Sequence, residues 1–114
     1  MIKLFIAGDF CENERIHVLN NEGKYDEVFI DTSSIKKADL SIINLESPIV
    51  LNSTDKLKKP GPIFKSTVRT LDALKYAGFN IFTLANNHFY DYGDIGVNDT
   101  LNACKKNNVE YVGG

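Results

Sequence analysis

Four short apolar runs limit what this chain can fold into more than any other feature of the sequence. They are, in chain order, Ile2–Gly8, Leu40–Leu45, Asn80–Ala85 and Val109–Val112. Each run has the length of a β-strand, and nearly continuous apolar strands are typical of parallel sheets whose two faces are both covered. We therefore predict four strands, and we expect the first of them to be buried on both faces.

Helical patterns fill the intervals between the last three runs. Apolar residues at helical spacing predict a helix that Ser66 caps and Gly78 ends. A second helix is predicted between a cap at Asp94 and an end at Asn107 or the residue after it. This alternation predicts an α/β fold, with a mainly parallel sheet, flanking helices and right-handed crossovers. For residues 12–38 we expect an irregular stretch with one or two short helical turns.

The composition narrows the class of protein. The 114 residues are enough for a single domain, and 43% hydrophobic with 25% charged residues is usual for a soluble globular protein. A net charge of −2 and scattered lysines argue against a nucleic-acid partner. No apolar run approaches the roughly 20 residues that a membrane-spanning helix needs, and the N-terminus lacks the pattern of a secretion signal. We therefore expect no transmembrane segment in this chain and, for the chain as written, a cytoplasmic location.

Polar side chains follow three of the four predicted strands. In chain order they are Asp9, then Asn44 and Glu46, then Asn86, Asn87 and His88, with Asp91 three residues later. The carboxyl ends of parallel strands meet at one edge of a sheet, and α/β proteins bind ligands there. Carboxylate, amide and imidazole groups suit Mg, Mn, Fe or Zn ions. The sequence therefore predicts a divalent-metal site at this edge, where an ion could activate water and a histidine could protonate a leaving group.

Each of these residues also has a purely structural interpretation. Asp9 after a glycine can cap a turn, and Asn86 and Asn87 can supply left-handed turn conformations. Glu46 can be a surface acid, and a histidine such as His88, taken alone, is more often a hydrogen-bonded structural residue. The joint occurrence of these groups at successive strand ends favours the metal site.

Two longer motifs resemble those of a known family. Residues 38–46 read Ala-Asp-Leu-Ser-Ile-Ile-Asn-Leu-Glu and are similar to the Ala-Asp-…-Asn-Leu-Glu motif of the bacterial poly-gamma-glutamate capsule synthesis proteins of the CapA type. Residues 84–93 resemble their Ala-Asn-Asn-His-x-x-Asp-x-Gly motif. The segments Gly8-Asp9, Asp99-Thr100-Leu101 and Tyr111-Val112-Gly113 also match in the same order, so the resemblance covers essentially the whole chain.

The resemblance implies a fold, a site and a function. The family is related to the calcineurin-like metallophosphoesterases, whose four-layer α/β/β/α fold holds two metal ions at its strand ends. Residues 1–114 would then be a single, truncated domain, the N-terminal half of such a fold. The implied metal ligands are Asp9, Asn44, Glu46 and Asn87, and the implied catalytic pair is His88 with Asp91. The implied function is capsule biosynthesis with a divalent-metal-dependent, phosphoesterase-like hydrolase site.

The sequence departs from that pattern in two ways. Classical relatives open with Asp-x-His, whereas Cys11 stands at the third position here, where we expect a buried free thiol more than a ligand. The metal-binding histidines of a C-terminal half are missing, since His17 and His88 are the only histidines. A catalytically incomplete binding or assembly module in capsule synthesis or export is therefore the alternative function. A small flavodoxin-like domain, which would bind a flavin or nucleotide without a metal, is a third interpretation.

If the domain is truncated, as the resemblance implies, we also expect this chain to associate with another chain. A parallel sheet that stops after its fourth strand leaves an apolar face or edge uncovered. We therefore expect a homo-oligomer, or a missing C-terminal half, to cover it, and the family implies capsule-synthesis partners. Members of that family are often exported or membrane-anchored, which this chain as written does not show.

Overall fold

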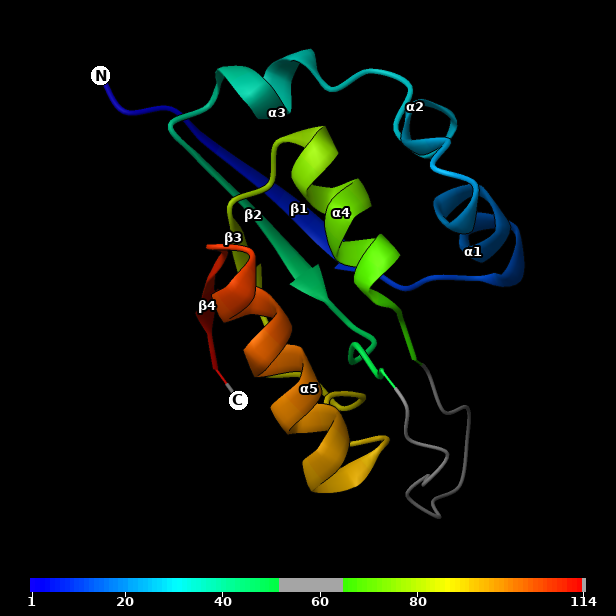
Figure 1. Ribbon diagram of the computed structural model, residues 1–114. Coiled ribbons are helices and arrows are strands. Elements are labelled where there is room, and N and C mark those ends of the chain that lie inside the picture. Colours follow the sequence, from blue (N-terminus) through cyan, green and yellow to red (C-terminus); the bar gives the residue numbers. More distant parts are fainter. Residues whose placement is uncertain (52–64, 114) are drawn as a thin grey trace.

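The computed structural model describes residues 1–51 and 65–113 and contains one sheet. The four strands are parallel and lie in the order β1-β2-β3-β4 (Figure 1). They are β1 (Leu4–Phe10), β2 (Leu40–Leu45), β3 (Ile81–Thr83) and β4 (Glu110–Val112). The predicted α/β class, with a parallel sheet and flanking helices, is confirmed.

Two helices connect the last three strands. They are α4 (Val68–Ala77) and α5 (Gly93–Lys106). Their predicted ends are correct, because Gly78 stops α4 in the left-handed conformation with a φ of 108° and Asn107 follows α5. Their predicted starts are displaced. Thr67 rather than Ser66 precedes α4, and Asp94 lies inside the first turn of α5 instead of capping it.

Residues 12–38 are more helical than predicted. They contain α1 (Glu14–Asn21), α2 (Tyr25–Val28) and α3 (Ser33–Lys37). Asn13 caps α1, because its Oδ1 accepts a hydrogen bond from the N–H of Ile16 at 2.9 Å. The expectation of an irregular stretch is therefore wrong for α1, which has 8 residues. None of the helices in residues 1–51 and 65–113 is both long enough and apolar enough to cross a membrane.

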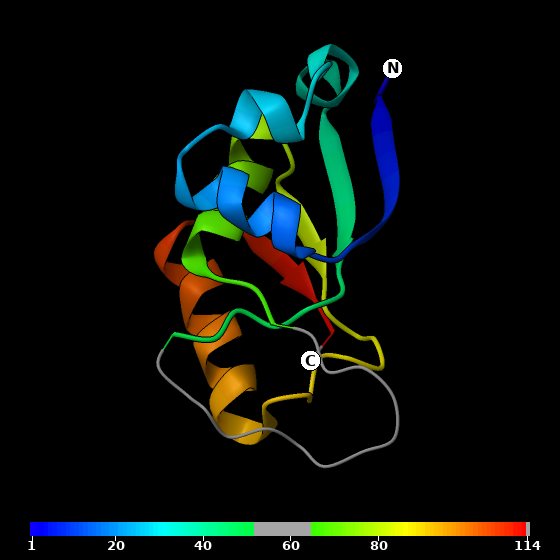
Figure 2. The same ribbon diagram turned by 90° about the vertical axis from the view of Figure 1, so that its right-hand side faces the viewer.

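The hydrophobic core lies between the sheet and the helices, which Figure 2 shows on one side of the sheet. Its fully buried side chains include Leu45, Leu71, Leu74, Phe82 and Leu84. These residues come from β2, α4, β3 and the segment after β3, so their packing fixes the strands against the helices. The carboxyl ends of the strands are thereby held at one edge.

On the other side of the sheet, six apolar side chains are exposed or half-buried, and we call this patch the open face. It comprises Leu4, Ile6, Leu40, Ile42, Ile81 and Val112. The exposed fractions of Leu4, Ile6 and Val112 are 56%, 71% and 62%. Leu4 pairs with Leu40 and Ile6 with Ile42, so these side chains are neighbours. The expectation that the first strand is buried on both faces is therefore wrong, and the exposed apolar face that we expected is present.

Candidate functional site

A register shift in β1 determines on which side of the sheet the side chain of Asp9 points. Ile6 pairs with Ile42, but three residues later Asp9 pairs with Asn44, which is only two residues after Ile42. Such an irregularity reverses the side of the strand on which the following side chains point. Asp9 therefore faces the same side as Asn44, and the Nδ2 of Asn44 donates a hydrogen bond to the Oδ1 of Asp9 at 2.6 Å.

Asn44 joins three strand ends through its side chain. Its Oδ1 accepts hydrogen bonds from the Oγ1 of Thr83 at 3.0 Å and from the Nδ2 of Asn86 at 3.2 Å. Asn86 also donates to the carbonyl oxygen of Leu45 at 2.9 Å. The ends of β1, β2 and β3 are thus connected by side chains as well as by the sheet.

Glu46 follows β2 and lies beside Asp9. Its backbone N–H donates to the carbonyl oxygen of Phe10 at 3.0 Å, and 18% of its side chain is exposed. Burial raises the pKa of the Glu46 carboxyl above its ordinary value of 4.5, and the hydrogen bond to Asp9 and the charge of Asp9 raise it further. Two carboxylates held this close attract a proton or a cation.

His88 approaches this pair from the loop after β3. Its Nδ1 lies 2.7 Å from the Oδ2 of the fully buried Asp91, and its Nε2 lies 3.9 Å from the Oε1 of Glu46. The backbone N–H of His88 donates to the Oδ1 of Asn86 at 3.0 Å. Because the Asp91 carboxylate can only accept when ionised, it holds the hydrogen of His88 on Nδ1 and turns Nε2 toward Glu46.

Asn87 and Cys11 lie in the segments that carry these groups. Asn87 stands between Asn86 and His88, and it is exposed. Cys11 is a partly buried free thiol, and Cys104 is a fully buried one, as expected of free cysteines. Burial raises the pKa of the Cys11 thiol, and the negative charge of Glu46 raises it further.

Two of the structural interpretations do not hold. Asn108 is the only non-glycine residue with positive φ in the described ranges, so Asn86 and Asn87 do not serve as left-handed turn residues. Glu46 is not a surface acid, because most of its side chain is buried against its neighbours. The polar residues at these strand ends therefore form a connected group.

The donor types of this group suit a divalent cation, but the set is incomplete. Asp9 and Glu46 offer carboxylates and His88 offers an imidazole. A cation would relieve the repulsion between Asp9 and Glu46, which adds to the effect of burial in raising the pKa of Glu46. Within residues 1–51 and 65–113, however, no group of three or more His, Cys, Asp and Glu side chains is spaced to hold a metal ion. The residues fit one side of a metal site and need further ligands.

Sequence patterns did not single out two polar residues near this edge. Thr83 ends β3, so its position at a strand end is a signal that points to it. Glu12 has a side chain that is only 1% exposed and is bonded to side chains of α1 and α4. Nothing in the local sequence indicates that this glutamate is buried.

Comparisons with known proteins agree on one family. The family model described as "Bacterial capsule synthesis protein PGA_cap" matches residues 3–114. The chain is 31% identical over 115 residues to "Capsule biosynthesis protein CapA" of Bacillus anthracis, covering 98% of this chain and 28% of that relative. It is 27% identical over 108 residues to "PGA biosynthesis protein CapA" of Bacillus subtilis (strain 168), covering 94% of this chain and 28% of that relative. This chain, which spans little more than a quarter of the length of these relatives, belongs to the PGA_cap family of bacterial capsule synthesis proteins.

Proposed function

We propose that this chain supplies one side of a divalent-metal site of the metallophosphoesterase type in a capsule biosynthesis protein. The observation that carries the proposal is the position of Glu46, whose carboxyl lies beside that of Asp9 and has its Oε1 3.9 Å from the Nε2 of His88. One relative is named for capsule biosynthesis and the other for PGA biosynthesis, and these names support a role in making the capsule polymer. Such a site would serve one of two classes of reaction. The first is hydrolysis of a phosphoester, and the second is amide-type transfer or release of the polymer.

In this proposal Asp9, Glu46 and Asn87 hold the cation, which is Mn, Fe, Zn or Mg. When bound, such an ion polarises a substrate oxygen and lowers the pKa of a water molecule. Asn44 was predicted as a fourth ligand. Because its Oδ1 already accepts from Thr83 and Asn86, its proposed role is to orient Asp9, and direct binding of metal by Asn44 stays a prediction.

The imidazole of His88 is the proposed proton donor or acceptor. The Asp91 carboxylate fixes its Nδ1, so Nε2 is the atom that faces Glu46 and any substrate bound beside it. A histidine oriented in this way can protonate a leaving group or stabilise developing negative charge. His88 is 6% exposed, so only a ligand that enters this edge of the sheet would reach it.

Metal titration tests the proposal. We expect Mn²⁺ to bind stoichiometrically in calorimetry, and Asn87→Ala and His88→Ala to weaken that binding. Asn98→Ala, a change on the exposed surface of α5, is the matched control and should bind as the unchanged chain does. Wild-type protein that shows no saturable Mn²⁺ binding, with Fe²⁺ and Zn²⁺ giving the same result, would contradict the metal site.

One observation favours a second candidate function. Because the described residues contain no complete cluster of metal ligands, the chain fits a binding or assembly module that has the fold without the catalysis. Such a module would act through a second copy of itself or through other capsule-synthesis proteins. Absence of metal binding together with stable self-association in sedimentation would favour this candidate over the first.

A further inference from the structure

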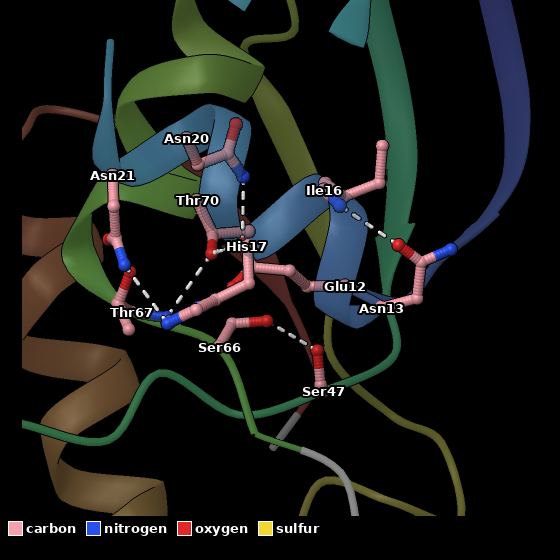
Figure 3. A network of polar contacts seen from close by, with 10 residues as sticks. All are labelled: Glu12, Asn13, Ile16, His17, Asn20, Asn21, Ser47, Ser66, Thr67 and Thr70. Atoms are coloured by element: carbon pink, nitrogen blue, oxygen red, sulfur yellow. Dashed lines mark hydrogen bonds and ion pairs between the residues drawn. The ribbon is translucent and has the colours of Figure 1, made fainter. Parts of the chain in front are cut away.

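Glu12 is a buried carboxylate three residues after Asp9. Its Oε1 lies 2.6 Å from the Nδ1 of His17, and its Oε2 accepts a hydrogen bond from the Nδ2 of Asn20 at 2.7 Å (Figure 3). The same oxygen accepts from the hydroxyl of Thr70 in α4. Glu12 therefore ties the end of β1 both to α1 and to α4.

A second polar contact ties the end of β2 to the start of α4. The hydroxyls of Ser47 and Ser66 are hydrogen-bonded and both residues are fully buried (Figure 3). The N–H of Ser66 donates to the carbonyl oxygen of Pro48 at 2.7 Å, and the carbonyl of Ser66 accepts from the N–H of Val50 at 3.0 Å. The residues directly after Glu46 thus run beside the segment that enters α4.

These two contacts close a ring with the sheet, and we call this ring the brace. From Glu12 it passes through Thr70 and the start of α4 to Ser66, then through Ser47 to Glu46. The hydrogen bond from the N–H of Glu46 to the carbonyl oxygen of Phe10 completes it. Asp9 lies beside Phe10 in the chain, so both acids of the proposed metal site lie in or next to the brace.

The chemistry of the brace favours a positioning role over simple packing. A buried carboxylate is costly unless charged hydrogen bonds satisfy it, and an apolar contact could join α4 to this loop at lower cost. Bonds from three side chains on two helices instead hold Glu12 in one orientation. The pairing of β1 with β2 holds Asp9 less firmly than a regular pairing would, because the register of β1 shifts between Ile6 and Asp9.

We infer that Glu12 and Thr70 are positioning residues that set the separation of the Asp9 and Glu46 carboxylates through the brace. The inference rests on the proposed function for its consequence, which is the affinity for a divalent ion. Its structural part does not depend on a metal, since it concerns the backbone of Glu46 in the metal-free chain. Groups that act behind metal ligands in this way typically change metal affinity by about 10- to 100-fold when removed.

The substitution Thr70→Val tests the brace, because it keeps the size of the side chain and removes the hydroxyl, which bonds to Glu12 and also accepts from the N–H of Thr67 at the start of α4. We expect the amide hydrogen of Glu46 to exchange about tenfold faster in metal-free protein by NMR, and Mn²⁺ binding to weaken about tenfold. Thr70→Ser, which keeps the hydroxyl, should restore both values. Thr32→Val is the matched control, because Thr32 lies at the start of α3 and its side chain makes no capping hydrogen bond.

The outcomes separate the brace from the proposed function. If Thr70→Val lowers the melting temperature but leaves Glu46 exchange and Mn²⁺ affinity as in Thr32→Val, the brace is only a fold contact and the inference fails. If the wild type binds no Mn²⁺ while Thr70→Val still speeds Glu46 exchange, the brace stands and the proposed metal site fails. If Thr70→Val does not fold, Ser47→Ala opens the second contact, and unchanged Glu46 exchange in that variant overturns the inference.

Discussion

Asp9 and Asn44 lie opposite each other on adjacent parallel strands and are joined by a hydrogen bond of 2.6 Å. The bond depends on the register shift in β1, because a regular strand would point Asp9 toward the helices. Asn44 in turn accepts hydrogen bonds from Thr83 and Asn86. The side chain of Asn44 therefore connects the ends of β1, β2 and β3, and Asn44 is the first target for mutation.

Asn44→Ala should destabilise the fold by about 1–3 kcal/mol, because it removes the acceptor of the Thr83 hydroxyl and one of the two acceptors of the Asn86 amide. Urea unfolding at neutral pH measures this change. Asn98→Ala, on the exposed side of α5, should stay within about 0.5 kcal/mol of the unchanged protein. Equal stabilities of the two variants would show that Asn44 does not connect the strand ends.

The raised pKa of Glu46 predicts an unusual pH dependence. Burial and then Asp9 raise this pKa in the folded chain above its ordinary value of 4.5, so the folded state binds the proton more tightly than the unfolded state. The contribution of Glu46 to stability is therefore full below the unfolded pKa and is lost as the pH rises through the folded pKa. Melting temperatures between about pH 4 and pH 7 should show this loss.

One substitution and the addition of Mn²⁺ test this pH dependence further. Glu46→Gln cannot ionise, so its stability should depend less on pH over the same range. Mn²⁺ should stabilise the wild type more at pH 7 than at pH 4, because the cation must compete with the proton for Glu46. A wild type and a Glu46→Gln variant with parallel pH profiles would show that Glu46 titrates as an ordinary surface acid.

Asp91→Asn should change the tautomer of His88. The Asp91 carboxylate accepts the hydrogen of Nδ1, whereas an amide at this position can donate to Nδ1 and favour hydrogen on Nε2. The ¹⁵N shifts of the imidazole report the tautomer directly. We expect hydrogen mainly on Nδ1 in the wild type and a shift toward Nε2 in the variant; the same tautomer in both proteins would argue that Asp91 does not orient His88.

The open face predicts self-association of this chain. Leu4, Ile6 and Val112 expose more than half of their surface on it, and parallel sheets are normally covered on both sides. Sedimentation at micromolar concentration should detect a dimer or larger oligomer, and Ile6→Lys should shift it toward the monomer. Ile30→Lys is the control, because Ile30 is 93% exposed but lies outside the sheet. A compact wild-type monomer would contradict this prediction.

The sequence predicted the elements whose limits are set locally. β2 spans Leu40–Leu45 as expected, because its apolar run is bounded by charged residues, and α4 ends at Gly78 because the chain adopts a left-handed conformation there. The helix α1 was missed because its apolar face is weak and its position depends on Glu12, which bonds to it from outside the helix.

The candidate site was predictable only in part. The proximity of Asp9, Asn44 and Glu46 follows from the rule that parallel strands end at one edge, and the structure brings them together. Their roles as ligands, and those of His88 and Asp91 in catalysis, stay predictions. The orientation of Asp9 could not be predicted, because a register shift depends on the pairing of two strands and leaves no pattern in either one.

The order β1-β2-β3-β4 has a consequence for how the protein is made. Each strand before β4 pairs with the next strand in the chain, so each new strand can pair with the one that was synthesised just before it. The sheet can therefore grow in the direction of translation, with N-terminal strands docking while later ones are still inside the ribosome. Asp9 and Glu46 can thus meet on the nascent chain before His88, which follows Glu46 by about 40 residues, has left the ribosome.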